Sequence, residues 1–472
     1  MNKLILLTPF LLLMLMGIAG ATTPSAIPSG IQYYVPLNLT NSQSTATSAP
    51  FQQMVNITES TYSSYIAYNG NLANFEIFNG TGAVRSAWIE SNSSGVLRVW
   101  VKLPNGIPAN SKVTLYLGFA AKTTNLLSSS GTSGIGEAPQ LSSTYAEYDD
   151  GASVFNNYWN FAGTTLPSTF DNQLAGSGGS YTVDNGITLT ITTGGAGYYE
   201  HVYSTSTYNP VGQIVEALQT THGGGADEVL QWAVSLGASG SDGWGNINVV
   251  GFGYDGNGDL EVRTVSGGAA SGYQGASITT PGIVGGSWQA TGTDEAFWNY
   301  TTTEIGGSTN QPTIGNAYID LFIDNNAGST TFQYIRTRAY PPSGVMPSVT
   351  FGAVQSATIP TLSISPNPAT YGQSVTITAT CHASTDTCAI DYPSLGTAIA
   401  TGTGSATYTY NAFSLGAGVS RITGRSYGYR LTVCGWVGRN RENWINKLHS
   451  PEGYAGHYAV GRVGTSAKPL DV

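Results

Sequence analysis

Two neighbouring segments of this chain alternate apolar and polar residues with a period of two, and this pattern constrains the fold most strongly. In residues 97–103 the odd positions are Leu, Val, Val and Leu, and the even positions are Arg, Trp and Lys. Residues 113–119 repeat the pattern, with Val, Leu, Leu and Phe at the odd positions. Successive side chains of a strand point to opposite faces, so both segments are predicted to be half-buried antiparallel strands. The intervening sequence Pro104-Asn105-Gly106-Ile107-Pro108 is typical of a turn.

The composition predicts an all-β protein of an exported or surface-displayed kind. The chain has 472 residues, enough for two to four domains with sizeable cores. Only 9% of them are charged, against roughly 25% in an ordinary soluble domain. The net charge of −10 argues against nucleic acid as a partner, because phosphate binding requires clustered Lys and Arg.

Residues 1–21 have the pattern of a signal peptide. Lys3 supplies the positive start, an apolar run from Leu4 to Ile18 follows, and Ala19-Gly20-Ala21 matches the small-x-small cleavage pattern. The alternative is an uncleaved membrane anchor, but the run is shorter than the roughly 20 residues that a span needs. We therefore expect a secreted or cell-surface protein with no transmembrane span after signal removal.

Five Asn-x-Ser/Thr sequences in the exported part are candidate glycosylation sites: Asn38, Asn56, Asn79, Asn92 and Asn299. One interpretation is chance, because the chain is rich in Asn and Thr. The other is a glycan-coated face near the N-terminus, which fits an extracellular location.

Residues 31–140 are predicted to form a first β unit, and a family resemblance supports this. The succession "FEIF", a Gly-rich turn, "SAWIES", "VWVKLP" and "IPANSKVTLYLGFA" resembles the DUF2341 family. That family is a β-rich domain of unknown function, common in large exported proteins and often adjacent to concanavalin-like sandwiches. The resemblance implies surface architecture and supplies no catalytic residues.

Residues 145–354 are predicted to form a larger β unit. Strand-like runs such as residues 186–191, 213–218 and 318–323 recur between Gly-rich turns. Many short strands with such turns favour a β-sandwich or jelly roll. The opening residues 148–161 and the closing residues 334–338 are similar to concanavalin-like laminin-G/glucanase domains.

Residues 361–418 resemble an incomplete immunoglobulin-like repeat of microbial surface proteins, so the expected fold class is tandem β-sandwiches. Cys381 and Cys388 flank one of its turns. In an oxidising setting a disulfide is favoured, and closing so short a loop would stabilise the fold by about 2.5 kcal/mol. The alternative is two buried or free thiols.

Residues 419–472 differ sharply in composition from the rest. From Arg421 onward the chain has 8 of the 17 Lys and Arg but only 3 of the 27 Asp and Glu. This basic tail is expected to be irregular. One interpretation is a genuine tail that binds an acidic surface. The favoured one is a frameshift or chimeric join near Gly418, which would leave Cys434 without a partner.

Carboxylates suited to glycoside hydrolysis are not evident along the chain. Concanavalin-like glucanases typically have a Glu-x-Asp-x-x-Glu run on one strand, and no such run occurs. The adjacent pairs at 227–228 and 294–295 would point to opposite faces of a strand. Glu200 and Glu216 are isolated candidates that only folding could bring together. We therefore expect a non-enzymatic protein, with a glycosidase as the less favoured alternative.

One string resembles a metal-binding loop. Asp255, Asn257 and Asp259 offer oxygen ligands at alternate positions, as a Ca²⁺ loop does. The distal Glu of an EF-hand is missing, and strand-like residues flank the string. A hairpin turn therefore explains the same residues and is favoured.

Aromatic residues are the other candidates for sugar binding, because their faces stack on sugar rings. Trp232 shares a face with Leu230 and is predicted to be core. Trp244 is flanked by turn residues and is the better exposed candidate, although packing on the core is the commoner fate. Trp100 and Tyr116 are expected on the non-core face of the first unit unless a second layer covers them.

The sequence thus predicts an exported, non-enzymatic surface protein that functions in adhesion or carbohydrate binding, with extracellular glycans or envelope proteins as partners. A structural component of the cell envelope is the alternative.

Overall fold

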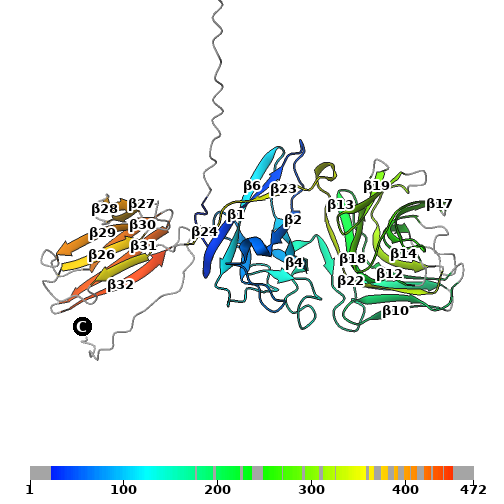
Figure 1. Ribbon diagram of the computed structural model, residues 1–472, viewed down its shortest axis with the longest axis horizontal. Coiled ribbons are helices and arrows are strands. Elements are labelled where there is room, and N and C mark those ends of the chain that lie inside the picture. Colours follow the sequence, from blue (N-terminus) through cyan, green and yellow to red (C-terminus); the bar gives the residue numbers. More distant parts are fainter. Residues whose placement is uncertain are drawn as a thin grey trace, which may run out of the picture.

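The computed structural model shows an all-β protein, as predicted (Figure 1). It describes residues 23–449 except 176–177, 195–197, 224–226, 236–247, 268, 290–292, 308–311, 325, 358–360, 366–373, 381–386, 392–397, 404, 412–418, 427–428 and 439–440. The predicted signal segment, Trp244 and Cys381 therefore lie outside the described residues.

The first sandwich is built from two sheets, which are antiparallel except for one parallel pair, β4 (Ala87–Ser93) with β7 (Gly136–Glu137), at the edge of the second sheet. One sheet has the order β23 (Ser348–Phe351), β1 (Ile31–Asn41), β6 (Ser111–Ala120) and β3 (Phe75–Phe78), with β24 (Gln355–Ser356) also paired to β1. The other has the order β2 (Phe51–Thr58), β5 (Val96–Leu103), β4 (Ala87–Ser93) and β7 (Gly136–Glu137), and the short helix η1 (Glu59–Tyr62) follows β2.

The two alternating segments are strands β5 and β6, which confirms the prediction. Leu97 and Val99 from β5 pack with Leu115 and Leu117 from β6 in one buried core. Trp100 and Tyr116 point away from that core, but they lie on different sheets and both are covered. Neither is therefore an exposed sugar platform.

The large sandwich is inserted into the first one, so the predicted boundary at residue 354 is wrong. Strand β23 pairs with β1, with Leu39 opposite Val349. Strand β24 pairs with the start of β1, with Tyr34 opposite Gln355. The chain therefore leaves the first sandwich after β7 and returns to it through β23. A strand of four residues gives little local signal for such a long-range pairing.

The large sandwich contains an eight-stranded and a seven-stranded sheet. The eight-stranded sheet has the order β10 (Gly179–Val183), β11 (Ile187–Ile191), β22 (Gly328–Ala339), β13 (Gln213–Thr221), β18 (Gly282–Ser287), β19 (Thr293–Trp298) and β20 (Thr302–Gly307), with β8 (Asn157–Trp159) paired to β22. The seven-stranded sheet has the order β17 (Ala269–Ser277), β16 (Asp259–Ser266), β15 (Asn248–Tyr254), β14 (Asp227–Ser235), β21 (Tyr318–Asp324), β12 (Tyr199–Ser204) and β9 (Phe170–Ala175). Two short helices, α1 (Gly151–Val154) and η2 (Pro342–Gly344), lie before β8 and after β22.

Apolar side chains from both large sheets meet in one core. Leu230 and Trp232 of β14 lie in it, as predicted, together with Leu321 of β21 and Ile335 of β22. The predicted strand runs correspond to β11, β13 and β21.

The C-terminal unit also consists of strands in its described residues, which corrects the prediction of an irregular tail as far as His449. One sheet has the order β25 (Thr361–Ser365), β26 (Ser374–Thr380) and β29 (Ser405–Asn411). The other has the order β28 (Ala398–Thr403), β27 (Thr387–Asp391), β30 (Val419–Ser426), β31 (Tyr429–Gly438) and β32 (Arg441–His449). Strand β30 pairs with β27, so strands of the basic tail extend a sheet that begins before residue 418. Charge composition does not decide strand formation, because β-ladders are made by the backbone. The frameshift stays a prediction.

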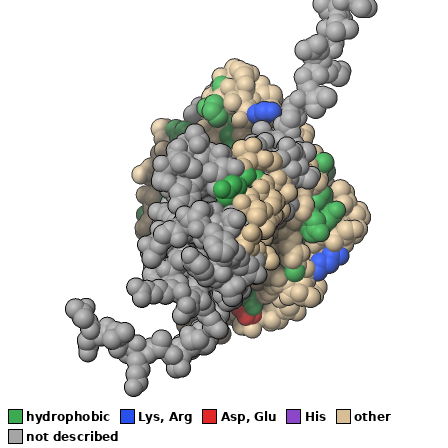
Figure 2. All heavy atoms as spheres, turned by 90° about the vertical axis from the view of Figure 1, so that its left-hand side faces the viewer, with side chains coloured by type: hydrophobic (Ala, Val, Ile, Leu, Met, Phe, Trp, Pro, Cys, Tyr) green, Lys and Arg blue, Asp and Glu red, His purple; other side chains and the backbone are tan. Residues whose placement is uncertain are grey.

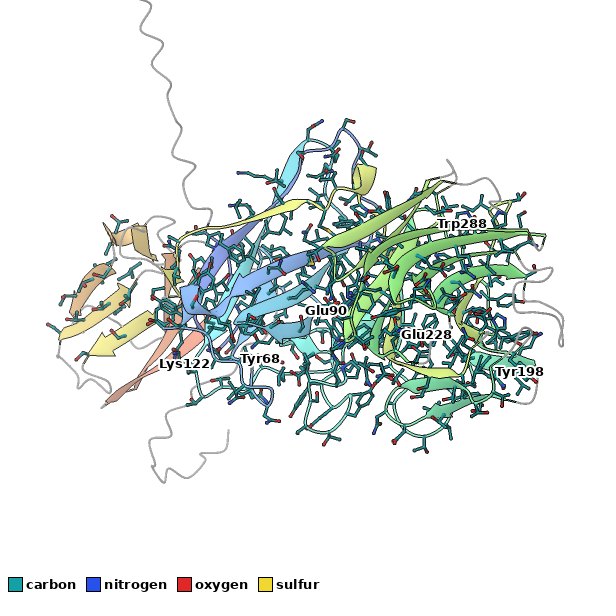
Figure 3. All side chains as sticks on the ribbon, turned by 45° about the vertical axis from the view of Figure 1, so that its right-hand side comes forward. Tyr68, Glu90, Lys122, Tyr198, Glu228 and Trp288 are labelled. Atoms are coloured by element: carbon teal, nitrogen blue, oxygen red, sulfur yellow. The ribbon has the colours of Figure 1, made fainter. Side chains whose placement is uncertain are left out.

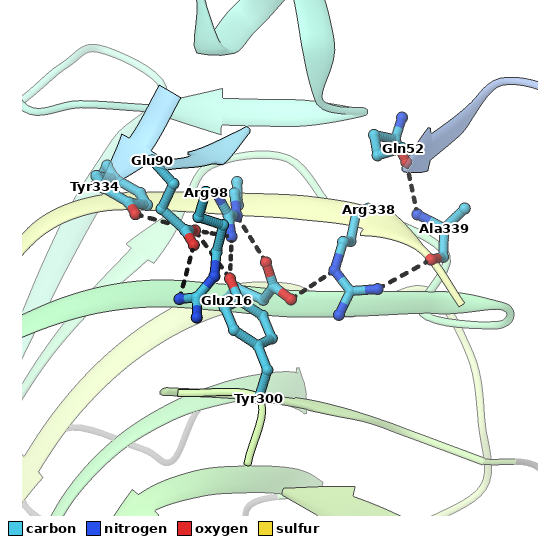
Figure 4. A network of polar contacts seen from close by, with 9 residues as sticks. Gln52, Glu90, Arg98, Glu216, Tyr300, Tyr334, Arg338 and Ala339 are labelled. Atoms are coloured by element: carbon cyan, nitrogen blue, oxygen red, sulfur yellow. Dashed lines mark hydrogen bonds and ion pairs between the residues drawn. The ribbon is translucent and has the colours of Figure 1, made fainter. Parts of the chain in front are cut away.

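The first and large sandwiches pack against each other around a buried arginine, Arg336, and Figure 4 labels its partners Glu90, Glu216 and Tyr300. Arg336 of β22 bonds to Glu90 of β4, to Tyr300 and, at 2.6 Å, to Glu216 of β13. The second oxygen of Glu216 accepts a bond from Arg338 at 2.6 Å. Burial alone would raise the pKa of Glu90, but Arg336 and Arg98 outweigh it and lower that pKa. The charges therefore form a paired network inside the junction.

Aromatic rings enclose this network. The Arg336 guanidinium lies 4.4 Å from the centroid of Phe155 and 4.9 Å from that of Trp100, with Trp88 and Tyr334 slightly farther. Apolar residues of both sandwiches complete the cluster. Such burial predicts that the two sandwiches unfold cooperatively.

The surface has few charges, as the composition requires. Figure 2 shows isolated Lys or Arg and acidic side chains among uncharged atoms on the face that it presents. Among the described residues, no helix is long and apolar enough to cross a membrane.

Candidate functional site

The outer face of the seven-stranded sheet is unusually polar for a buried surface. Alternation sends Leu230, Trp232 and Leu321 into the core. Their neighbours in sequence therefore point to the other side. We call this side the polar face, and its chemically active members are His201, Asp227, Gln231, Glu261, Arg263, Asp320 and Asp324. A separate apolar cluster of Tyr199, Val229 and Phe322 lies among them.

One half of the polar face is centred on Asp320. Its Oδ2 accepts a hydrogen bond from Gln231 Nε2 at 2.6 Å and lies 2.6 Å from His201 Nδ1. The strand register produces this contact, since Gln231 is directly opposite Asp320 and His201 is opposite the nearby Phe322. All three polar side chains are fully buried.

Several buried polar atoms of this half have no hydrogen-bond partner in the described part of the chain. They are Asp320 Oδ1, Gln231 Oε1 and His201 Nε2. A buried polar atom without a partner costs about 1–3 kcal/mol, so such groups are normally satisfied by water or by a ligand. Two of the three atoms are oxygens that require a donor.

The other half of the polar face is centred on Arg263. Its Nη1 lies 2.9 Å from Asp227 Oδ2, and its Nη2 lies 3.1 Å from Glu261 Oε2. Asp227 is directly opposite Asp324 in the strand register. Burial lowers the pKa of Arg263, but Glu261, Asp227 and Asp324 outweigh it and raise that pKa. One guanidinium thus holds acidic groups that would otherwise repel each other.

Glu261 has an altered proton affinity at this site. Burial raises the pKa of Glu261 to about 7, with Arg263 opposing the shift and Asp227 adding to it. Its Oε1 has no hydrogen-bond partner among the described residues. A carboxyl group with such a pKa can donate or accept a proton near neutral pH.

The predicted metal string is a hairpin turn between β15 and β16. Asp255 Oδ1 accepts the N–H groups of Asn257 and Asp259 at 3.0 and 2.8 Å, and Asp255 Oδ2 accepts Asn257 Nδ2 at 3.0 Å. The favoured turn interpretation agrees with this geometry. Within the described residues, no group of three or more His, Cys, Asp or Glu is arranged to hold a metal. The Ca²⁺ site stays a prediction.

The carboxylates singled out in the sequence do not converge. Asp227 faces Arg263, whereas Glu228 accepts Gln219 Nε2 at 2.8 Å between the two sheets (Figure 3), which confirms the opposite-face prediction. Glu216 belongs to the junction network. Glu200 lies on the core side beside Asn172, where burial raises its pKa to about 7.

The predicted glycosylation sites differ in their surroundings. Asn38 accepts the Thr114 hydroxyl at 2.9 Å, and Asn79 accepts N–H groups of its own turn. Asn56 and Asn92 are exposed, and Asn299 accepts the N–H of Ile283 at 2.9 Å. Cys388 lies in β27, but its predicted partner is outside the described residues.

Sequence reasoning missed Gln231, Arg263 and Asp320. A signal existed in β21, where Asp320 and Asp324 interrupt an otherwise apolar strand with the spacing of one face. Nothing local indicated that β14, β16 and β12 would bring partners to that face.

No family model matches the chain, so the likenesses to DUF2341 and to immunoglobulin-like repeats rest on sequence resemblance alone. A relative in Sulfolobus islandicus rod-shaped virus 1, an uncharacterized protein 562, is 29% identical over 346 residues. The match covers 66% of this chain and 58% of the relative. The chain thus spans little more than half the length of that relative.

Solved structures that are similar include glycosidases and lectin-like domains. A Bacillus licheniformis β-glucanase is 10% identical with a TM-score of 0.29, covering 39% of this chain and 97% of that chain. The potassium-bound Emp46p carbohydrate recognition domain is 10% identical with a TM-score of 0.26, and the match covers 36% of this chain and 88% of that domain. A legume lectin-like domain from Entamoeba histolytica is 11% identical with a TM-score of 0.27, and the match covers 36% of this chain and 90% of that domain. We base no functional argument on TM-scores of this size.

Proposed function

We propose that this protein is an exported carbohydrate-binding protein whose binding site is the polar face of the seven-stranded sheet. The observation that supports the proposal is a set of oxygens on one face, from Asp320, Gln231 and Glu261, that have no hydrogen-bond partner among the residues that the structure describes. Sugar hydroxyl groups donate hydrogen bonds to such oxygens. The neighbouring Tyr199 and Phe322 are buried rings on the same face, and both pack on His201, with centroids 4.9 and 4.4 Å from that of the imidazole.

A substitution at Asp320 tests this proposal. The full-length chain is applied to a glycan array, and the best glycan is titrated by calorimetry into wild type, Asp320→Asn and the matched control Asp184→Asn, an exposed residue. A hydrogen bond to a charged group contributes about 1.5–3 kcal/mol. Asp320→Asn should therefore weaken binding about 10- to 100-fold. No binding by wild type at millimolar sugar, or equal binding by both variants, would contradict the proposal.

Glycoside hydrolysis is a second candidate, favoured by Glu261 and Asp227. Asp227 and Glu261 contact the two terminal nitrogens of one guanidinium at 2.9 and 3.1 Å, so the fold brings two carboxyl groups to one place on the polar face, and glycoside hydrolysis needs such a pair. Glu261 has the pKa of a proton donor at neutral pH. It would protonate the glycosidic oxygen as the bond to the anomeric carbon breaks. Asp227 would attack that carbon, and water would then release the sugar, with Glu261 taking up its proton.

Release of reducing ends from the glycans that bind separates the two functions. Glu261→Gln should lower the rate at least about hundredfold. Glu200→Gln is the matched control, because Glu200 has a similar pKa but lies on the core side. If wild type releases no reducing ends from a glycan that it binds, the protein only binds.

A further inference from the structure

A cleft lies between the first and large sandwiches, separate from the polar face. Its volume is about 680 Å³, within the range of roughly 300–1,000 Å³ that ligand sites occupy. Strands β2, β4 and β5 of the first sandwich form one wall, and strands β13, β18 and β22 with the turn after β19 form the other. A ligand in the cleft would contact both sandwiches.

The chemistry of the cleft suits an uncharged ligand with many hydroxyl groups. Amide and hydroxyl side chains line both walls: Asn56, Ser91 and Asn92 on one, Thr220, Asn299 and Thr301 on the other. Among the described residues that line it, the charged ones are Glu90 and Arg98, which are paired with each other at 3.4 Å. The lining therefore offers no net charge for a phosphate or a sulfated chain.

Two polar atoms at the cleft need partners. Arg98 Nε and Gln140 Oε1 are buried and have no hydrogen-bond partner within the described part of the chain. One is a donor and the other an acceptor, and a hydroxyl group can satisfy either. Leu218 and Ile283 add apolar surface between the polar groups. This mixture matches a sugar ring, which has polar edges and C–H faces.

Three of the five glycosylation sequences lie at this one cleft. Asn56 and Asn92 come from the first sandwich, and Asn299 comes from the large one. Asn38 and Asn79 are not among the lining residues. An N-linked glycan is itself a largely uncharged oligosaccharide, so attached and free glycans share the chemistry that the cleft would recognise.

We propose that the cleft between the two sandwiches binds an uncharged oligosaccharide chain, either the protein's own N-linked glycan or a free one. The proposal does not depend on the polar face. Occupation of the cleft would tie the two sandwiches together beside the Arg336 network, because Glu90 belongs to both.

The first arm of the test examines the attached glycan. The full chain is purified from its source cells, and its glycopeptides are identified by mass spectrometry. If the glycan lies in the cleft, Thr220→Trp should displace it. Its removal by an endoglycosidase under native conditions should then be at least tenfold faster than in Thr182→Trp. Thr182 is an exposed strand residue away from the cleft and serves as the matched control.

The second arm uses chain made in a host without N-glycosylation and an array of uncharged oligosaccharides of three to eight units. Thr220→Trp should weaken binding at least tenfold, and Thr182→Trp should leave it unchanged. Asp320→Asn should not affect this binding, which distinguishes the cleft from the polar face. The cleft proposal is overturned if all three asparagines are unmodified and no binding is sensitive to Thr220→Trp. A second result would also overturn it. In that case an attached glycan is removed at the same rate from Thr220→Trp and Thr182→Trp, and Thr220→Trp weakens the binding of no free glycan.

Discussion

Replacing Arg336 by methionine should destabilise the junction between the two sandwiches more than any surface arginine could. The side chain is fully buried, and its guanidinium bonds to two buried carboxylates, Glu90 and Glu216. Methionine retains much of the apolar volume but no charge. Breaking a buried ion pair by removing one partner costs about 3–5 kcal/mol, because a buried charge is left uncompensated.

Remaining partners limit the loss to that range. Glu90 would keep Arg98 at 3.4 Å and Tyr300 at 2.9 Å, and Glu216 would keep Arg338 at 2.6 Å. Domains are typically stable by only about 5–15 kcal/mol, so the expected loss is a large share of the total. We expect Arg336→Met to lower the unfolding free energy by about 3–5 kcal/mol and to separate the unfolding of the two sandwiches into distinct transitions.

Urea denaturation followed by tryptophan fluorescence measures this effect, since Trp88 and Trp100 both lie at the junction. Arg85→Met is the matched control, because Arg85 is half-exposed and makes no ion pair within the described residues. The double variant Glu90→Gln with Arg336→Met should be less destabilised than Arg336→Met alone, because it also removes the buried Glu90 carboxylate that has lost its partner Arg336. Two results would refute the reasoning. One is a loss of unfolding free energy below about 1 kcal/mol for Arg336→Met. The other is a double variant whose loss equals the sum of the losses of Glu90→Gln and Arg336→Met.

Two further predictions concern the polar face and the turn beside it. Burial raises the pKa of Glu261 from its ordinary value to about 7. Between about pH 4.5 and 7 the folded state therefore binds more protons than the unfolded state. The free energy of unfolding consequently falls as the pH rises through this window. Thermal unfolding of Glu261→Gln should accordingly depend less on pH between 5 and 8 than wild type does, and an unchanged pH profile would show that Glu261 titrates normally. At the β15–β16 turn, Asp255→Ala removes a carboxylate that accepts two backbone N–H groups and should cost about 1–3 kcal/mol. Calorimetry with and without Ca²⁺ gives the second readout there, and a melting temperature that does not move with Ca²⁺ would remove the predicted metal site.

Local features of the fold followed from the sequence because they depend on local alternation. The inward side chains of β5 and β6, the core position of Trp232 and the opposed directions of Asp227 and Glu228 all follow from a period of two. The turn at Asp255 follows from the turn preferences of Asp, Asn and Gly.

Only the tertiary structure decided which strands lie side by side, and with them the candidate sites. The return of β23 to β1, the meeting of His201 with Asp320, and the contact of Arg336 with Glu90 join residues far apart in the chain. Such pairings depend on register and on packing of whole sheets, which no short sequence window contains. The sequence by itself therefore determined a charge-poor chain of alternating strands. The folded sheets determined where its few buried charges meet, because a buried charge is stable only beside a partner that the fold brings to it.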